Sequence, residues 1–229
     1  MNLKCSVSIA PLRKEPSDRA EMVSQLLFGE EFNIIETQEK WVKIVCLHDG
    51  YEGWMDRKQA ESISEIPFST QPISHPIFIQ NQFFPAGCYA SQQDASYKPL
   101  LLEDLARSYL FSPYLWGGKT HAGIDCSGFS QMVFRLVGKN IPRDAYQQAE
   151  LGEVVSFVEE AKTGDLAFFD NAEGHIIHVG ILLNTHDSSF PKIIHASGWV
   201  RLDTLDSDGI KKENGEQSHR LRIIKRIDF

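Results

Sequence analysis

The chain has 229 residues, of which 42% are hydrophobic and 24% charged, a composition typical of a folded protein rather than a disordered one. This length is enough for one large domain or two modest ones. The formal net charge of -8 argues against nucleic acid as a main partner, because neutralising phosphates requires clustered Lys and Arg.

The N-terminus and the cysteines indicate where such a chain is expected to work. No apolar signal segment follows Met1, and no apolar run elsewhere is long enough to span a bilayer. Provided that the sequence begins at its natural start, this predicts a cytoplasmic protein with no membrane partner. None of the four cysteines stands in a C-x-x-C spacing, so we expect no metal and no cofactor. Three of them are expected to be reduced, small core residues: Cys5, Cys46 and Cys88.

Residues 1–62 contain short β-rich runs at 22–27, 31–36 and 41–46, separated by Pro, Gly, Asp and Asn. This pattern predicts a small all-β barrel. The P-L-R stretch at 11–13 and the D-G-Y-E-G-W stretch at 49–54 make the segment resemble a bacterial SH3 domain. That family commonly binds cell wall or positions substrate.

Residues 63–99 carry five prolines and show little periodicity, which predicts a linker. Apolar residues at 77–79 and 83–84 indicate that this linker packs on something, because a free tether would not carry so many apolar side chains.

From residue 100 the pattern changes to helices followed by strands. Residues 100–109 predict a helix, and apolar residues at 129, 132, 133, 136 and 137 predict a second one that buries one face and ends at Gly138. Asp144, with Gln147 three residues on, predicts the start of a short third helix. Apolar runs then predict an antiparallel sheet in an α+β domain spanning 100–229: 165–170, 176–183, 192–196 and 221–227.

Cys126 is the candidate nucleophile because it opens the amphipathic helix. Unpaired N–H groups and the dipole at a helix N-terminus favour an anion, and the thiolate is the reactive form of cysteine. We therefore expect a lowered thiol pKa at Cys126. A structural cysteine at a helix start is the alternative.

Two histidines stand inside predicted strands, where a buried imidazole needs a partner. His178 lies in 176–183 and His195 in 192–196. If residues 184–191 connect these strands, the two histidines are diagonal neighbours on one face, about 7–8 Å apart, and His195 can orient His178 as a third group orients the base of a triad. His175 points to the opposite face from His178, which argues against a metal site, and the remaining histidines, including His219, are expected to be solvated.

Six short motifs follow one another along the second half of the chain: Y-L-W-G-G from residue 114, D-C-S-G-F from 125, I-P-R-D from 141, G-D-L-A-F-F from 164, H-V-G-I from 178 and H-A-S from 195. Over residues 100–200 the chain thereby resembles the NlpC-type papain-like peptidases, which act on peptidoglycan peptides. The resemblance implies Cys126 as nucleophile, His178 as base and His195 as the orienting residue. It also implies an oxyanion hole made by the Cys126 backbone N–H and the Tyr114 hydroxyl, with a packing role as the alternative for Tyr114.

The pairing of a bacterial SH3 domain with this catalytic domain looks like the γ-D-glutamyl-L-diamino acid endopeptidases of cell-wall recycling. The resemblance implies a partner peptide, L-Ala-γ-D-Glu-diaminopimelate with a free L-Ala amine, which is cut before the diamino acid. Asp125 would bind the amine, cap the helix, or do both. Ala145 stands where relatives often place a Ser, which puts one substrate hydrogen bond in question. The other implied substrate-binding residues are Ser127, Arg143, Asp144, Glu15 and Tyr51.

Two other functions remain open from the sequence. An amidase or acyltransferase would use the same Cys-His-His set on another acyl group. A non-catalytic cell-wall-binding protein would use only the SH3-like module, although the intact set of Cys126, His178 and His195 disfavours it. The sequence does not indicate an oligomeric state.

Overall fold

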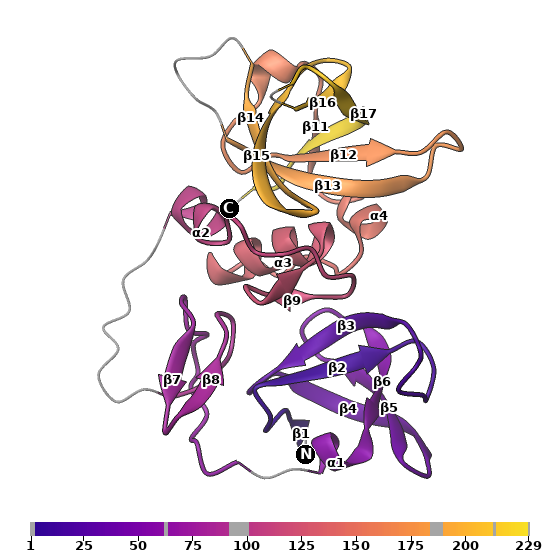
Figure 1. Cartoon of the computed structure of the whole chain (residues 1–229), viewed down its shortest axis with the longest axis vertical. Helices are drawn as coiled ribbons and strands as arrows, with labels where there is room; N and C mark the ends of the chain where they lie inside the picture. The colour runs from indigo at the N-terminus through magenta and orange to yellow at the C-terminus, as the bar shows by residue number, and fades with distance from the viewer. Residues whose placement is uncertain (1–2, 62–63, 92–100, 184–189, 213, 229) are drawn as a thin grey trace. The chain divides into compact units, whose positions relative to one another are not determined.

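The computed structural model describes residues 3–61, 64–91, 101–183, 190–212 and 214–228. The chain divides into two compact units (Figure 1). One comprises Met1–Pro99 with Leu115–Gly123, and the other comprises Leu100–Tyr114 with Ile124–Phe229. Among the described residues, no helix is both long enough and apolar enough to cross a membrane.

The first unit contains an SH3-like antiparallel barrel with the strand order β1-β4-β5-β6-β2-β3. In β5 the side chains of Val42, Ile44 and Cys46 alternate into the core, as the period of a half-buried strand requires. The three predicted strands are confirmed as β3, β4 and β5. The elements are β1 (Leu3–Lys4), β2 (Ile9–Arg13), β3 (Met22–Leu27), β4 (Glu31–Gln38), β5 (Trp41–Cys46), β6 (Glu52–Asp56) and the short helix α1 (Arg57–Ala60).

Residues 64–91 of the predicted linker pack onto this barrel. Phe28 of the barrel stacks on Phe68 with ring centroids 4.8 Å apart and meets Phe84 edge-on at 5.0 Å. The apolar runs form the hairpin of β7 (Ile77–Ile79) and β8 (Gln82–Phe84). Its two turn residues have positive φ, the conformation that tight hairpins favour. The remaining linker residues, 92–99, lie outside the described residues. Cys5, Cys46 and Cys88 are buried and form no disulfide, as predicted.

The segment Leu115–Gly123 joins the barrel through a buried ion pair. It carries β9 (Lys119–Thr120), which pairs with β10 (Gly123–Ile124). The ammonium of Lys119 lies 3.0 Å from the carboxylate of Glu30, and neither side chain has more than 1% of its surface exposed. The backbone N–H of Lys119 donates to the side-chain oxygen of Gln25 at 2.8 Å. Gly117 has φ +76, and a Cβ there would lie 2.4 Å from the carbonyl oxygen of Met22, so only glycine fits this approach.

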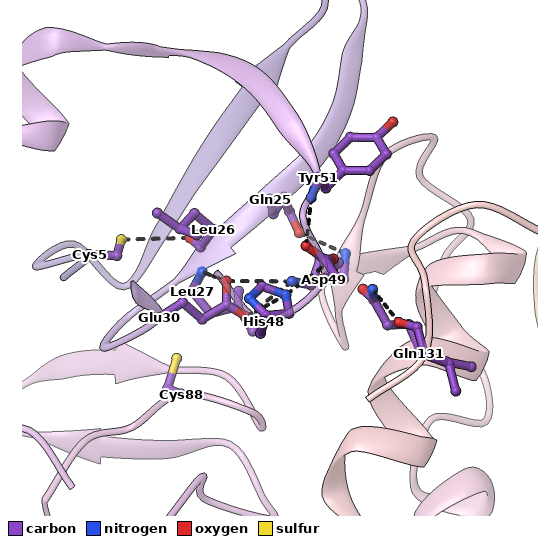
Figure 2. A network of polar contacts seen from close by, with 12 residues as sticks. Cys5, Gln25, Leu26, Leu27, Glu30, His48, Asp49, Tyr51, Cys88 and Gln131 are labelled. Carbon is purple, nitrogen blue, oxygen red and sulfur yellow. Dashed lines mark hydrogen bonds and ion pairs between the residues drawn. The ribbon is translucent and has the colours of Figure 1, made fainter. Parts of the chain in front are cut away.

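A second ion pair lies beside the first, as Figure 2 shows for Glu30, His48 and Asp49. His48 Nε2 is 3.2 Å from the carboxylate of Asp49 and 3.9 Å from that of Glu30. Burial raises the pKa of Asp49, but the hydrogen bond and charge of His48, followed by Lys119, outweigh it and hold this pKa well below its ordinary value. The carboxylates of this network therefore lie beside basic side chains, Lys119 and His48.

The second unit is built on an antiparallel sheet in the order β11-β17-β12-β13-β14-β15-β16. Strand β16 pairs with β17 as well as with β15, so the sheet closes on itself. The four predicted strands are confirmed as β12, β13, β14 and β17, whereas the other three were not predicted. The strands are β11 (Glu153–Val155), β12 (Leu166–Asp170), β13 (Ile176–Leu183), β14 (Lys192–Ser197), β15 (Trp199–Leu205), β16 (Gly209–Lys211) and β17 (Gln217–Arg226).

Figure 1 shows the α-helices of this unit on one side of its sheet: α2 (Leu102–Ser108), α3 (Cys126–Leu136) and α4 (Ala145–Gln148); a short 3-10 helix spans Val158–Glu160. Helix α3 packs against β13 and β14. It ends as predicted, because Gly138 has φ +88 and its N–H and that of Lys139 reach back to carbonyls of the last turn. Asp144 occupies the N-cap of α4, as the predicted helix start requires, although its carboxylate makes no capping hydrogen bond. The unit is α+β with an antiparallel sheet, as expected.

Candidate active site

Cys126 is the first residue of α3, and Asp125 is its N-cap. The Asp125 carboxylate accepts a 2.7 Å hydrogen bond from the Gly128 N–H, which satisfies one of the orphan donors of the first turn. The capping role predicted for Asp125 is therefore confirmed. It places the thiol at the beginning of the helix that packs on β13 and β14.

The thiol of Cys126 interacts with the backbone at Val179 of β13 and at Ser127. These contacts favour a thiolate, but burial and the nearby Asp125 carboxylate outweigh them and raise the pKa of Cys126 to about 12. The expectation of a lowered thiol pKa was wrong. Desolvation of the sulfur is a larger effect than the helix terminus, so the resting thiol is neutral.

The two strand histidines meet directly. Strands β13 and β14 pair in the predicted register, with Leu183 opposite Lys192. His178 Nε2 lies 2.8 Å from His195 Nδ1, a hydrogen bond between two buried rings. Gly180 makes room for this contact, because a Cβ there would lie 2.9 Å from the Cβ of His195. The diagonal arrangement expected for the pair is confirmed.

The sequence did not predict two neighbours of this histidine pair. Asp203 of β15 places its carboxylate 3.0 Å from His195 Nε2. His219 of β17 stacks on His178, with ring centroids 4.3 Å apart and planes 23° apart. The expectation that His219 is solvated was wrong. The alternation of charged and apolar residues from 199 to 205 was the available signal for the strand that carries Asp203.

Burial lowers the pKa of His178 well below its ordinary value of 6.5, and positive charge on His195 or His219 lowers it further. His178 is therefore neutral at neutral pH, with one ring nitrogen protonated and the other a proton acceptor. A neutral thiol and a neutral imidazole can exchange a proton during a reaction rather than before it.

Arg143 binds the carboxylate of Asp125 and holds it in place. Its guanidinium donates to both carboxylate oxygens, at 3.0 and 2.6 Å, and to the Ser127 hydroxyl at 2.9 Å. The guanidinium is 1% exposed. All the contacts described for its guanidinium thus lie within the first turn of α3, and a direct contact with substrate remains a prediction. Asp144, half-buried at the start of α4, likewise remains a prediction.

Tyr114 lies in the segment between α2 and β9. Its N–H donates to the Gly198 carbonyl at 2.9 Å, and it forms a parallel bridge with Ile124, two residues before Cys126. Burial raises the pKa of Tyr114, and the nearby Cys126 and Asp125 raise it further. The phenol keeps its proton and remains a hydrogen-bond donor.

The other two predicted substrate residues belong to the barrel unit. Glu15 is exposed in the loop between β2 and β3. Tyr51 is half-buried before β6, its N–H donates to Asp49 at 3.0 Å, and Figure 2 shows its phenol pointing away from the ion pairs. Their predicted contacts with the substrate amine remain predictions.

Comparison with known proteins identifies the family of this chain. Residues 112–217 match the NlpC/P60 family, and residues 12–59 match the bacterial dipeptidyl-peptidase SH3 domain. The gamma-D-glutamyl-L-lysine dipeptidyl-peptidase of Bacillus subtilis (strain 168) is 31% identical over 69% of this chain and 68% of its own length. The chain belongs to the NlpC/P60 family of cysteine peptidases. The interpretation as a purely wall-binding protein is therefore not retained.

Two further matches extend the NlpC/P60 assignment. A gamma-D-glutamyl-L-lysine dipeptidyl-peptidase of Bacillus cereus (strain ATCC 10987 / NRS 248) is 25% identical over 84% of this chain and 73% of its own length. The crystal structure of an NlpC/P60 family protein from Bacillus cereus ATCC 10987 covers 99% of both chains with a TM-score of 0.71 and 20% identity. At that identity the solved structure shows a shared fold.

Proposed function

We propose that this NlpC/P60 peptidase hydrolyses the bond between γ-D-glutamate and an L-diamino acid in short peptidoglycan stem peptides. The substrate carries a free N-terminal L-Ala, and the product is L-Ala-γ-D-Glu. Diaminopimelate is the diamino acid that we expect, although two relatives are named for L-lysine. The observation that carries the proposal is the Cys126 thiol at the start of α3, beside the strand that presents the hydrogen-bonded His178–His195 pair.

The reaction starts from the neutral thiol. Cys126 Sγ attacks the γ-carbonyl carbon of D-glutamate while its proton passes to the free ring nitrogen of His178. Collapse of the tetrahedral intermediate breaks the C–N bond, and His178 returns the proton to the leaving amine. Water then attacks the thioester, again with His178 as base, and frees the dipeptide acid and the thiol. His195 holds the far nitrogen of His178 throughout.

The oxyanion needs two donors. We assign them to the Cys126 backbone N–H and the Tyr114 hydroxyl, which its raised pKa keeps protonated. At the amine end, the L-Ala ammonium would be an additional cation on Asp125, whose carboxylate already binds Arg143. Ser127, Asp144, Glu15 and Tyr51 complete the proposed substrate contacts.

The first test is Cys126→Ala with L-Ala-γ-D-Glu-diaminopimelate as substrate. We expect no L-Ala-γ-D-Glu by mass spectrometry, because the thioester cannot form. The lysine-containing tripeptide, run in parallel with the wild-type protein, measures the preference for the diamino acid. Turnover by the alanine variant would contradict the mechanism.

A second test concerns the free amine. N-acetylation of the substrate's L-Ala is expected to block cleavage, because the neutral amide cannot serve as the cation on Asp125. Equal cleavage of acetylated and free peptides would contradict this role and indicate a broader endopeptidase. Added amines separate hydrolysis from acyl transfer, since a transferase would incorporate the amine into the product instead of water.

We propose cytoplasmic cell-wall recycling as the setting. A reducing compartment suits the four free cysteines, one of which is the proposed nucleophile. Fractionation of producing cells with the tripeptide assay should recover the activity in the cytosol. Activity confined to the cell-wall fraction would contradict this setting.

A further inference from the structure

The hydrogen-bond chain that starts at the proposed base does not end at His195. His178 Nε2 lies 2.8 Å from His195 Nδ1, and His195 Nε2 lies 3.0 Å from the Asp203 carboxylate. The side chains of His195 and Asp203 are each 1% exposed, so each interaction is made away from water. Three residues on neighbouring strands thus form one line.

A fourth residue fixes which oxygen of Asp203 faces the histidine. Arg201 Nη2 donates to Asp203 Oδ1 at 2.8 Å, while Oδ2 faces His195. Arg201 is itself held in place, because β14 and β15 pair with Arg201 opposite His195, and its guanidinium lies 5.0 Å from the Trp199 ring centroid. A guanidinium can only donate and an ionised carboxylate can only accept, so the direction of each bond is determined.

The donor and acceptor roles at Asp203 determine the roles at each of the two histidines in turn. The Asp203 carboxylate accepts from His195, which therefore carries its proton on Nε2. In the neutral ring, Nδ1 is then an acceptor, so the 2.8 Å contact requires His178 to donate from Nε2. The remaining nitrogen of His178, Nδ1, is left with a lone pair. A base needs that lone pair to take the thiol proton.

We propose that the Arg201–Asp203 pair sets the tautomers of both histidines and thereby keeps Nδ1 of His178 available to the Cys126 thiol. Arg201 and Asp203 act through the histidines, so they are positioning residues. The inference rests on the proposed function for its effect on rate, but the tautomers themselves are a property of the free protein.

A direct measurement needs no substrate. Nitrogen-15 NMR of the histidine rings distinguishes protonated from unprotonated nitrogens, and in the wild type we expect Nε2–H on both His178 and His195. Protonation of either ring on Nδ1 in the neutral protein would overturn the proposal. This outcome is independent of which peptide the enzyme cleaves.

Asp203→Asn is the most decisive variant because Arg201 fixes the orientation of the new side-chain amide. The donor-only guanidinium requires the amide oxygen at the Oδ1 position, which turns the NH₂ group toward His195 Nε2. His195 must then carry its proton on Nδ1, and His178 must accept at Nε2 and be protonated on Nδ1. We expect kcat to fall by about 10³- to 10⁴-fold, comparable to the loss from a wrong tautomer in a serine-protease triad. KM should change little.

The double variant Asp203→Asn with Arg201→Leu tests whether removing the guanidinium restores the histidine tautomers and kcat. Without the guanidinium the amide can turn and present its oxygen to His195, which restores the wild-type tautomers. We expect kcat to recover at least 10-fold over Asp203→Asn, with the NMR pattern returning to Nε2–H. A merely structural ion pair can also recover stability when both partners are removed, but it predicts the wild-type NMR pattern in the single and the double variant alike.

Asp165→Asn is the matched control. Asp165 is a buried carboxylate of the same unit, and it is held by Arg226 with hydrogen bonds of 2.9 and 2.7 Å. This variant should lose stability without changing histidine tautomers or the pH dependence of kcat. Near-wild-type kcat in a folded Asp203→Asn protein, or the same NMR change in the control, would refute the role of Asp203.

Discussion

Each unit of the molecule buries a cluster of titratable side chains, and the two clusters are built in opposite ways. In the cluster of the barrel unit each of two acids has a basic side chain beside it, with Lys119 at 3.0 Å from Glu30 and His48 at 3.2 Å from Asp49. In the second unit three imidazoles lie within 6 Å of one another, at centroid distances of 5.0, 4.3 and 5.9 Å. Their carboxylate, Asp203, contacts one imidazole, His195, through Oδ2, while its Oδ1 accepts from Arg201.

The difference teaches what each arrangement can do. Adjacent opposite charges keep both groups ionised, and the pair is expensive to break once it is buried. Adjacent imidazoles disfavour one another's charged forms, so His178 stays neutral and can accept a proton during a reaction. The first cluster is therefore suited to holding the fold, and the second is suited to the proton transfer that we propose.

Among the further changes that separate the two clusters, we expect the largest effect at His178, the proposed base. His178→Gln should lower kcat/KM by about 10²- to 10⁴-fold, the usual contribution of general acid–base catalysis. His175→Gln is the control, because its ring is exposed and it precedes β13. Steady-state kinetics on the tripeptide measure both. Wild-type kcat/KM in His178→Gln would exclude this histidine as the base.

Breaking the Lys119–Glu30 ion pair should lower the stability of the barrel unit. Lys119→Met leaves the Glu30 carboxylate buried without its ammonium partner, and we expect a loss of about 3–5 kcal/mol. Adding Glu30→Gln removes that charge while keeping an acceptor for the Leu27 N–H, which Glu30 binds at 2.8 Å, so much of the loss should return. Hydrogen exchange over β2–β6 gives the local free energy of unfolding. A double variant no more stable than the single one would contradict this account.

The stack of His219 on His178 should contribute a smaller effect. His219→Ala removes the ring that fixes the plane of the base, and we expect kcat to fall about 2- to 10-fold, the range for one aromatic pair. His219→Phe keeps a ring face and should stay near wild type. Kinetics that fall equally in both variants would show that the imidazole nitrogens, and not the stacking, are what matters.

The smallest effect concerns the pH dependence of stability around the histidines of the second unit. Burial lowers the pKa of His178 well below 6.5 and that of His219 to about 4. Below pH 6.5 the unfolded chain therefore binds more protons at these histidines than the folded protein does. The second unit should therefore lose stability as pH falls below 6.5. The pKa of Asp49 is lowered from 3.8, so its stabilisation is present above that value and is lost as pH falls below it.

Hydrogen exchange between pH 7 and pH 4.5, corrected for intrinsic rates, measures this contrast. The β12–β14 peptides should lose protection over this range, and those of His219→Phe should lose less. Equal pH dependence in His219→Phe and the wild type would show that His219 does not contribute.

Much of the fold followed from local patterns. The strands at 22–27, 31–38 and 41–46, and the helix that Cys126 begins, each bury residues at a fixed spacing, and a short window of sequence shows that spacing. The register of β13 and β14 also followed, because the connection between them is short. Strand β16 has three residues, too few to show a period.

The sequence by itself determined that Cys126 begins a helix and that His178 and His195 are neighbours, since both depend on residues close along the chain. Only the tertiary structure decided that Asp203 and His219 surround the histidines, that Lys119 pairs with Glu30 89 residues away, and that burial raises the thiol pKa. Contacts between distant segments and the loss of water around a group are set by how elements pack, and no local periodicity encodes them.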